Sequence, residues 1–453
     1  MRTKIVATIG PASSGKEMLL AMIKRGLCLA RINFSHGSHR SNGELMKNIR
    51  QAAGDLGKNI GVITDLQGPR IRVKTVKDKL ELKQDAIGLI FEGEQNLVNP
   101  SKKIDFQLGL DSKKLLNHLE SGDSIYIDNG MMEARVIERL SRGLLCKVVV
   151  GGVIKPRKGV NIPKISPKME AFTPSDAKNL EFALAQNVDF VAMSFVKTAA
   201  DIKVLRKKIK KLLPNTEPEE LPGIIAKIET NEAVKNFTQI LDAVDGIMIA
   251  RGDLGIEQPM EKIPALQKTM IKQCLQKSKP VIVATQMLES MMENSIPTRA
   301  EVTDVANAVI DHADAVMLSG ETAMGKYPAK TIQTMRKIID YTEEGPYDDL
   351  DFDDLVNDHV ASLMFIAKSA VTLAREIEAN SIIIKNSPLE VVYKISRFRP
   401  EMNIYFLTNN KYLSRKLSLL WGAEAIYSMD NLQGPFVVVD SVMEKNGQIR
   451  YQM

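Results

Sequence analysis

Eight short apolar runs, each finishing in polar residues, are the feature that most restricts the folds open to this chain. The runs are residues 4–8, 29–32, 61–64, 189–193, 224–230, 246–250, 280–284 and 315–318. Segments with helical signals lie between most of them, so the runs predict parallel strands in alternating β–α order. Eight such units indicate a (β/α)8 barrel of the TIM type, an α/β fold whose active site lies where the carboxyl ends of the strands converge.

The alternation is interrupted after the third predicted strand. Residues 73–158 contain short alternating runs, such as 124–127 and 147–150, separated by turn sequences such as that at 128–130. This pattern predicts an all-β insert of barrel or sandwich type. Because the insert leaves from a loop beside the predicted catalytic face, we expect it to act as a lid.

We therefore expect the chain to divide into three domains. Residues 1–72 and 159–342 form the two parts of the barrel, and residues 73–158 form the lid between them. An acidic linker at 343–354 leads to a third domain of α/β type, which covers residues 355–453.

Charge and composition exclude several classes of function. The net charge of +6 is small for 453 residues, and the densest basic run, 203–211, has apolar residues at helical spacing. That run indicates a solvated helix face, so we expect no nucleic-acid partner. No apolar run approaches the roughly 20 residues of a membrane span, and we expect no membrane partner. The widely spaced Cys28, Cys146 and Cys274 predict free thiols and, with no signal peptide expected, a cytoplasmic location.

The fifth run carries the most informative polar residues. Lys227 lies near the end of an otherwise apolar strand, and Glu229, two residues on, faces the same side. The sixth run leads to Asp253. If the two carboxylates meet at about 4 Å, they repel by roughly 4 kcal/mol at an effective dielectric of about 20, which favours a bound divalent cation such as Mg²⁺. Lys227 beside a metal suits a phosphate-like group, although a structural ion pair at a strand end remains an alternative.

Seven motifs connect the chain with a known family. They are KIVATIGPAS at 4–13, RINFSHG at 31–37, DLQGP at 65–69, KIE at 227–229, ARGDLG at 250–255, ATQMLESM at 284–291 and LSGETA at 318–323. In this order, and with the insert in this place, they resemble the pyruvate kinases, densely up to about residue 340 and thinly beyond. The resemblance implies phosphoryl transfer from phosphoenolpyruvate to ADP, which yields pyruvate and ATP in glycolysis.

Matched residue by residue, the resemblance implies a metal-assisted site. Glu229 and Asp253 are implied as the Mg²⁺ ligands, and Lys227 and Arg31 are implied to contact the transferred phosphoryl group. Phosphoryl transfer needs mainly positioning and positive charge around three oxygens, which Lys, Arg and Mg²⁺ provide. The residue types therefore agree with the implied reaction.

The same matches imply further roles. The Gly252 backbone and the Thr285 hydroxyl are implied to hold the substrate carboxylate, with Asp253 also a substrate contact. Ser319 is implied to help deliver a proton to the enolate carbon. The implied nucleotide contacts are Asn33, His36, Arg72 and Lys158. A turn cap for His36 and a helix start for Ser319 remain alternatives.

One departure from the family concerns a monovalent cation. In the potassium-dependent branch, the loop after the third strand carries a Glu that helps to bind the ion, whereas residue 70 of this chain is Arg. A fixed guanidinium can supply the charge that K⁺ brings elsewhere, so we expect Arg70 to make K⁺ dispensable. The residues that match the family's cation site are still present, namely Asn33, Ser35, Asp65 and the carbonyl of Leu66.

The second departure concerns the third domain, in which a helix at 359–378 and strands at 381–384 and 403–407 are predicted. Many relatives carry a Thr/Ser/Gly-rich phosphate loop after the first strand of this domain, but residues 385–390 read KNSPLE. Only 32 residues follow Trp421, too few for the usual last helix and effector loop. We expect no activation by fructose 1,6-bisphosphate. The resemblance implies a homotetramer, to which this shortened domain normally contributes an interface.

Two other functions stay open on the sequence alone. A different phosphoenolpyruvate-using barrel enzyme, one that makes or breaks a C–C or C–P bond, would share the carboxylate-bound metal but needs neither the lid nor the loop at 65–72. A degenerate relative kept as a binding protein would explain the altered third domain, but not the intact Lys227, Glu229 and Asp253. An assay of Mg²⁺-dependent phosphorylation of ADP distinguishes these two functions from that of a pyruvate kinase.

Overall fold

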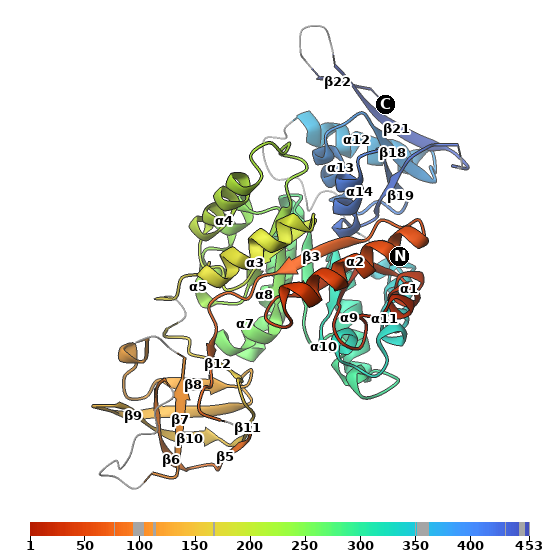
Figure 1. Cartoon of the computed structure of the whole chain (residues 1–453). Helices are drawn as coiled ribbons and strands as arrows, with labels where there is room; N and C mark the ends of the chain where they lie inside the picture. Colours follow the sequence, from red (N-terminus) through yellow and green to blue (C-terminus); the bar gives the residue numbers. More distant parts are fainter. Residues whose placement is uncertain are drawn as a thin grey trace.

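The structure, a computed structural model, consists of a β/α barrel, a small β domain and a carboxyl-terminal α/β domain (Figure 1). The residues that it describes are 1–76, 78–93, 104–111, 115–165, 168–348, 350, 362–430, 432–443 and 449–452. The predicted fold class is confirmed, because a closed eight-stranded barrel carries an all-β insertion after its third strand and a separate α/β sheet follows.

Eight parallel strands close the barrel in the order β1-β17-β16-β15-β14-β13-β3-β2. Their bounds are β1 Lys4–Thr8, β2 Leu27–Asn33, β3 Gly61–Asp65, β13 Phe190–Met193, β14 Gly223–Ile228, β15 Gly246–Ala250, β16 Val281–Ala284 and β17 Ala315–Leu318. Each lies within two residues of its predicted bounds. All residues of β1, β3, β14 and β15 are buried, since helices cover the outside of the barrel and side chains fill its inside.

Helices α1 to α11 surround the barrel. Their bounds are α1 Lys16–Lys24, α2 His39–Asp55, α3 Pro174–Ala185, α4 Ala199–Leu212, α5 Asn231–Lys235, α6 Phe237–Ala243, α7 Arg251–Glu257, α8 Ile263–Gln276, α9 Arg299–Ile310, α10 Gly320–Ala323 and α11 Pro328–Glu343. Thr173 caps α3, and Thr298 forms a capping box with Glu301 at the start of α9. The basic run at 203–211 lies on α4, which buries its apolar face. In the described part of the chain, none of the helices has the length and apolarity needed to cross a bilayer.

The described residues of the small β domain form nine strands. Their bounds are β4 Ile71–Arg72, β5 Leu80–Leu82, β6 Ile87–Glu92, β7 Phe106–Leu110, β8 Ser124–Ile127, β9 Met132–Leu140, β10 Gly143–Val150, β11 Gly152–Ile154 and β12 Gly159–Asn161. Seven of them form one sheet in the order β4-β12-β8-β9-β10-β6-β7, and β11 pairs with β5. Gly159 in β12 pairs with Arg72 in β4, so the chain enters and leaves this domain through two adjacent, antiparallel segments.

The carboxyl-terminal domain contains a five-stranded sheet in the order β20-β19-β18-β21-β22. Its elements are α12 Ser362–Glu376, β18 Ser381–Lys385, α13 Leu389–Ser396, β19 Asn403–Leu407, α14 Lys411–Lys416, β20 Ala423–Ile426, β21 Phe436–Met443 and β22 Ile449–Gln452. The 3₁₀ helices that lie within the described residues are η1 Leu115–His118, η3 Met260–Lys262, η4 Glu289–Met292, η5 Pro346–Asp348 and η7 Leu417–Leu419.

Two features of this domain differ from the expectation. The sequence analysis identified two of its strands, and β20, β21 and β22 add three more after Trp421. Part of the predicted linker at 343–354 belongs to α11 and η5, and its remainder falls largely outside the described residues, as does the predicted helix start at 359–361. The described residues after Trp421 therefore add three strands to the sheet.

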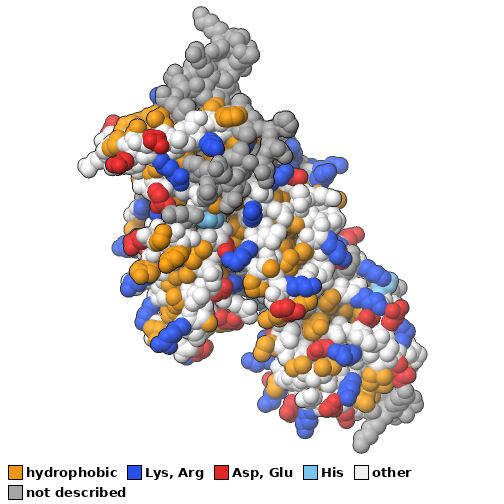
Figure 2. All heavy atoms as spheres, turned by 180° about the vertical axis from the view of Figure 1, so that it is seen from behind, with side chains coloured by type: hydrophobic (Ala, Val, Ile, Leu, Met, Phe, Trp, Pro, Cys, Tyr) orange, Lys and Arg blue, Asp and Glu red, His pale blue; other side chains and the backbone are white. Residues whose placement is uncertain are grey.

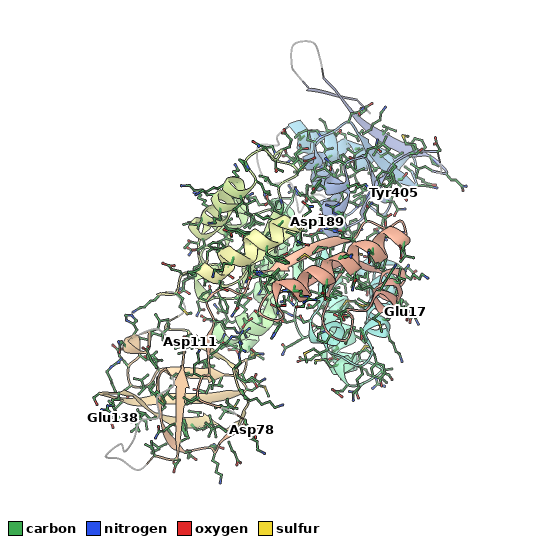
Figure 3. All side chains as sticks on the ribbon, in the orientation of Figure 1. Glu17, Asp78, Asp111, Glu138, Asp189 and Tyr405 are labelled. Atoms are coloured by element: carbon green, nitrogen blue, oxygen red, sulfur yellow. The ribbon has the colours of Figure 1, made fainter. Side chains whose placement is uncertain are left out.

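Buried charges attach the carboxyl-terminal domain to the amino-terminal end of the barrel (Figures 1 and 3). Asp189, labelled in Figure 3, pairs with Arg50 of the barrel at 2.7 Å and with Arg415 of the other domain at 2.6 Å. Nearby, the ring of Trp421 lies between the guanidinium groups of Arg2 and Arg399, at 5.4 and 5.2 Å from its centroid. The carboxyl ends of the barrel strands therefore remain open to the small β domain.

The surface between the barrel and the small β domain is hollowed. Figure 2 shows this hollow from behind, with basic and acidic side chains interspersed over both lobes. Since parallel strands of a barrel present their carboxyl ends at one face, the hollow lies where the sequence predicts a site.

Candidate active site

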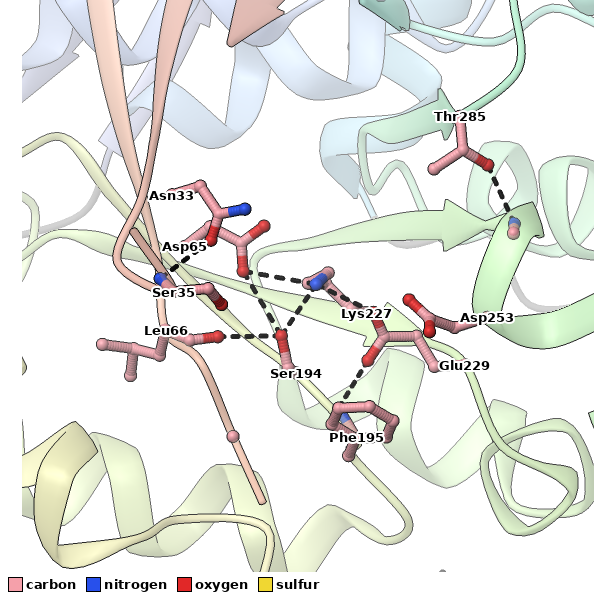
Figure 4. Close-up of polar contacts among 12 residues, drawn as sticks. Asn33, Ser35, Asp65, Leu66, Ser194, Phe195, Lys227, Glu229, Asp253 and Thr285 are labelled. Carbon is pink, nitrogen blue, oxygen red and sulfur yellow. Dashed lines mark hydrogen bonds and ion pairs between the residues drawn. The ribbon is translucent and has the colours of Figure 1, made fainter. Parts of the chain in front are cut away.

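The carboxyl end of β14 holds a buried cluster of opposite charges (Figure 4). The Lys227 ammonium lies 2.8 Å from Glu229 Oε1 and 3.3 Å from Asp65 Oδ1. It also donates a 2.7 Å hydrogen bond to Ser194 Oγ. Burial favours the neutral amine, but Asp65 and Glu229 hold the pKa of Lys227 above its usual value. The lysine is therefore a fixed positive charge.

Asp65, at the end of β3, joins this cluster to Arg31. Arg31 Nε and Nη2 each lie 2.7 Å from Asp65 Oδ2, and Arg31 Nη1 donates to Thr8 Oγ1 at 2.8 Å. Burial raises the pKa of Asp65, but Lys227 and Arg31 lower it by more, so its net shift is downward. One carboxylate thus orients both cations that the sequence assigned to the phosphoryl group.

Glu229 and Asp253 lie beside each other, following the neighbouring strands β14 and β15 (Figure 4). Glu229 Oε2 accepts a 2.7 Å hydrogen bond from the Phe195 backbone N–H. Burial raises the pKa of Glu229, and although Lys227 opposes this, Asp253 adds to it, so the net shift is upward. Asp253 lies in the first turn of α7, a helix that the sequence analysis did not identify.

The donor set fits a hard divalent cation. Mg²⁺ is commonly held by one or two carboxylates and fills its other positions with water and substrate oxygens. Among the described residues, no group of three or more His, Cys, Asp or Glu is arranged to hold a metal ion. The Glu229–Asp253 pair therefore suits a metal that is completed by its substrate, and not a closed structural site.

Thr285, directly after β16, has a strained backbone. Its φ of 74° is rare for a β-branched residue. Thr285 Oγ1 accepts a 2.8 Å hydrogen bond from the Gly252 N–H, and its carbonyl accepts one of 2.7 Å from Arg251 Nη2. These contacts turn the hydroxyl toward the amino end of α7, so the structure brings together the two groups predicted to hold the substrate carboxylate.

Ser319 follows β17 and precedes α10. It is the N-cap residue of α10, so the alternative of a helix-start residue fits this position, although its hydroxyl makes no capping hydrogen bond. The Ser319 N–H donates to Glu321 Oε2 at 2.7 Å, and the other oxygen of Glu321 accepts from the Leu288 N–H at 3.2 Å. Glu321 is 2% exposed and ties the loops after β16 and β17 together, a role that the sequence analysis missed.

A basic cleft of about 590 Å³ lies between the barrel loops and the small β domain. His36, Arg72 and Lys158, three of the four predicted nucleotide contacts, line it. Lys158 pairs with Asp128 at 2.8 Å. Burial lowers the pKa of His36, and the nearby arginines lower it further, so its imidazole is neutral at pH 7. The fourth predicted contact, Asn33, does not line the cleft; its side-chain oxygen accepts a hydrogen bond from the Ser35 N–H at 3.0 Å.

Arg70 spans the gap between the barrel and the small β domain. Its Nη2 lies 3.9 Å from Asp253 Oδ1 and donates to Asn129 Oδ1 at 3.2 Å. A Cβ at Gly159 would lie 2.9 Å from Arg70 Nε, so glycine leaves room for the guanidinium. The positive charge of Arg70 therefore lies beside a predicted metal ligand.

The four residues predicted for a monovalent cation have other partners in this structure. The side-chain oxygen of Asn33 is bonded to Ser35, and the Asp65 carboxylate is paired with Arg31 and Lys227. The Leu66 carbonyl accepts a 2.8 Å hydrogen bond from Ser194 Oγ.

Ser194 and Phe195 are further site residues that the sequence analysis did not assign. Ser194 Oγ contacts Lys227 and lies 3.3 Å from Asp65 Oδ1, while Phe195 supplies the N–H to Glu229. The available signal was the position of Ser194 directly after the fourth predicted strand. Every barrel strand ends in polar residues, so that signal did not single it out.

Comparison with known proteins gives the same family throughout. A model described as "Pyruvate kinase, barrel domain" matches residues 1–332, and "Pyruvate kinase, alpha/beta domain" matches residues 365–450. A Bacillus licheniformis pyruvate kinase is 39% identical over 94% of this chain and 71% of its own length. A Geobacillus stearothermophilus pyruvate kinase is 37% identical over 93% of this chain and 70% of its own length.

The solved structures agree with the sequence matches. A crystal structure of a pyruvate kinase from Cryptosporidium parvum is similar to this chain with a TM-score of 0.87 and 33% identity. The match covers all of this chain and 96% of that one. The fold, the matching models and these relatives together show that the chain belongs to the pyruvate kinase family of phosphotransferase enzymes.

Proposed function

We propose that this chain transfers the phosphoryl group of phosphoenolpyruvate to ADP with the help of Mg²⁺, yielding pyruvate and ATP. The observation that carries the proposal is the position of Lys227 at the carboxyl end of the barrel, 2.8 Å from Glu229 and beside Asp253. Positive charge next to a pair of metal-binding carboxylates is what phosphoryl transfer requires.

In the proposed site, Glu229 and Asp253 hold the metal ion, and Lys227 and Arg31 hold the phosphoryl group. Mg²⁺, when bound, neutralises charge on the phosphoryl oxygens. Asp65 fixes both cations through its ion pairs of 2.7 and 3.3 Å, so they need little reorganisation as the phosphoryl group passes from one oxygen to the other.

The proposed carboxylate site consists of the Gly252 N–H and the Thr285 hydroxyl, with Asp253 as a neighbouring substrate contact. The N–H donates to the hydroxyl oxygen at 2.8 Å. A carboxylate oxygen that took the place of this contact could accept from both the N–H and the hydroxyl. Transfer leaves the enolate of pyruvate, whose terminal carbon takes up a proton, and Ser319 is proposed to help deliver it.

The nucleotide is proposed to bind in the basic cleft, where its phosphates contact His36, Arg72 and Lys158, with Asn33 nearby. The small β domain, residues 73–158, is proposed to close as a lid over the two barrel segments, 1–72 and 159–342. Closure would exclude water, which otherwise competes with ADP for the phosphoryl group.

Two regulatory properties are part of the proposal. Arg70, 3.9 Å from Asp253, supplies the charge that K⁺ brings in other members, so activity does not require K⁺. Residues 385–390 read KNSPLE, without the glycine of a phosphate loop, and only 32 residues follow Trp421, so we expect no activation by fructose 1,6-bisphosphate. A substrate saturation curve that this sugar shifts clearly to lower concentration would contradict the second point.

Assembly and location are proposed from the family alone. We infer a cytoplasmic homotetramer, in which residues 355–453 contribute one interface. Light scattering of the purified chain after size-exclusion chromatography measures the oligomeric state.

The test is a lactate-dehydrogenase-coupled assay with phosphoenolpyruvate, ADP and Mg²⁺, with and without K⁺. Full activity in both supports the reaction and the role of Arg70. Activity with K⁺ alone keeps the reaction and contradicts that role. A folded but inactive protein contradicts the reaction and favours a binding protein. A Lys227→Met preparation, made in parallel, measures any contaminating kinase.

A further inference from the structure

A second cavity lies at the opposite end of the barrel from the candidate active site. It has a volume of about 420 Å³, within the usual range for small-molecule sites. The barrel contributes α4, the segment before β14 and the turn between α8 and β16, and the carboxyl-terminal domain contributes α13 and Lys416 of α14. It therefore lies between two domains, where ligand sites are common.

The side chains around this interdomain cavity carry an excess of positive charge. Its basic residues are Arg206, Lys210, Lys277, Lys279, Lys394 and Lys416, and its acidic residues are Glu219, Asp245 and Glu390. Asp245 is paired with Arg206 at 3.0 Å, and Glu390 with Lys394 at 3.1 Å. Two of the three carboxylates are thus already neutralised by their own partners.

Three of the six basic residues, Lys210, Lys279 and Lys416, have no carboxylate partner among the described residues, and Lys210 is exposed. Lys279 Nζ donates to the Val244 carbonyl at 2.8 Å, and Lys416 Nζ donates to the Glu219 carbonyl. Among the described residues, neither ammonium forms an ion pair. Lys416 is only 8% exposed, and burial lowers its pKa. An anion in the cavity would restore the solvation that the buried ammonium has lost.

The lining of the interdomain cavity also contains a neutral hydrogen-bond donor, the hydroxyl of a tyrosine. Tyr393 of α13 faces the cavity, and its hydroxyl makes no hydrogen bond to another residue of the described chain. Two ammonium groups and a phenol match the charge and the several oxygens of a phosphate group. Because inorganic phosphate would fill only a small part of 420 Å³, the remaining space suits an organic residue.

We propose that this interdomain cavity binds a small phosphate monoester, held by Lys279 of the barrel and Lys416 of the carboxyl-terminal domain. Nothing in the reaction proposed above uses it. Gly223, at the start of β14, lines the cavity, whereas Lys227 and Glu229 lie at the other end of the same strand. Substitutions can therefore separate the two sites.

The test is calorimetric titration of the full chain with glycerol 2-phosphate and, separately, with inorganic phosphate. We expect the ester to bind more tightly. Lys279→Met and Lys416→Met should each weaken its binding about tenfold or more, since each removes a charged hydrogen bond. Lys268→Met is the matched control, because this lysine lies on α8 outside the cavity and is paired with Asp311; its isotherm should match the wild type.

Three results would overturn the proposal. The first is that both cavity variants bind the ester as the wild type does. The second is binding that Lys227→Met abolishes and Lys416→Met retains, because the phosphate would then occupy the candidate active site. The third is binding of inorganic phosphate without the ester. Methionine keeps the length of the lysine stem, and thermal unfolding of each variant verifies that it is folded.

Discussion

Lys227 and Glu229 extend from the same side of the β14 segment, and their charged groups lie 2.8 Å apart at the carboxyl end of the barrel. Side chains two positions apart in a strand point to the same face, so the proximity of Lys227 and Glu229 follows directly from the local geometry. Both are almost fully buried, and Asp65 contacts the same ammonium from β3. Removal of one charged side chain would leave the other charges buried without a partner. The cluster should therefore be sensitive to single substitutions.

Replacement of Lys227 by Met should lower kcat by about 10²–10³, because the transferred phosphoryl group loses one fixed positive charge. The coupled assay at saturating Mg²⁺ measures this effect. Lys203→Met, at an exposed position of α4, is the control and should retain wild-type activity. A Lys227→Met enzyme with kcat within a few-fold of the wild type would show that this ammonium does not contact the reacting group.

Ser194 should act as a positioning residue. Its hydroxyl accepts from Lys227 at 2.7 Å and donates to the Leu66 carbonyl at 2.8 Å. Ser194→Ala should reduce kcat by about tenfold, the value of a hydrogen bond to a charged group, with little change in KM. Ser428→Ala, an exposed serine, serves for comparison. A rise in KM alone would instead assign Ser194 to substrate binding.

Magnesium binding should weaken at acidic pH. Burial and Asp253 raise the pKa of Glu229, and the protonated carboxyl cannot hold the metal, so protons compete at a higher pH than they do for an ordinary glutamate of pKa about 4.3. The Mg²⁺ concentration for half-maximal activity should therefore increase as the pH is lowered. In Glu229→Gln, this Mg²⁺ concentration should be high at every pH and change little with pH. A wild-type Mg²⁺ requirement that does not depend on pH contradicts the prediction.

Reversal of the charge at residue 70 should create a requirement for K⁺. Arg70→Glu places a carboxylate beside Asp253, so activity without K⁺ should fall by about tenfold or more, and added K⁺ should restore part of it. Initial rates over a K⁺ titration test this. Arg142→Glu is the control, because it makes the same charge change at an exposed position of the small β domain. It should keep the K⁺ dependence of the wild type. Equal activity of Arg70→Glu and wild type without K⁺ would exclude the role.

Much of the fold could be predicted because its signals are local. Each barrel strand is a short apolar run that is largely buried, and some helix starts carry a cap, such as Thr173 before α3 and Thr298 before α9. The insert was recognised from period-two alternation between turn sequences. Strand β20 was missed because a short run such as Ala423–Ile426 acquires strand structure only by pairing with the rest of the sheet. Strand β21, Phe436–Met443, is rich in valine, so its local signal was present and was overlooked.

The sequence by itself determined the order of the barrel strands and the polar residues that end them, since both depend on the alternation of apolar and polar side chains. It also placed Lys227 and Glu229 on one face of one strand. Only the tertiary structure decided which distant residues meet them. Asp65 and Ser194 reach Lys227 from strands 162 and 33 residues away, and the cavity between Lys279 and Lys416 exists only where two domains pack. Such contacts form only when the barrel closes and the domains pack together, so the local sequence around each residue does not predict them.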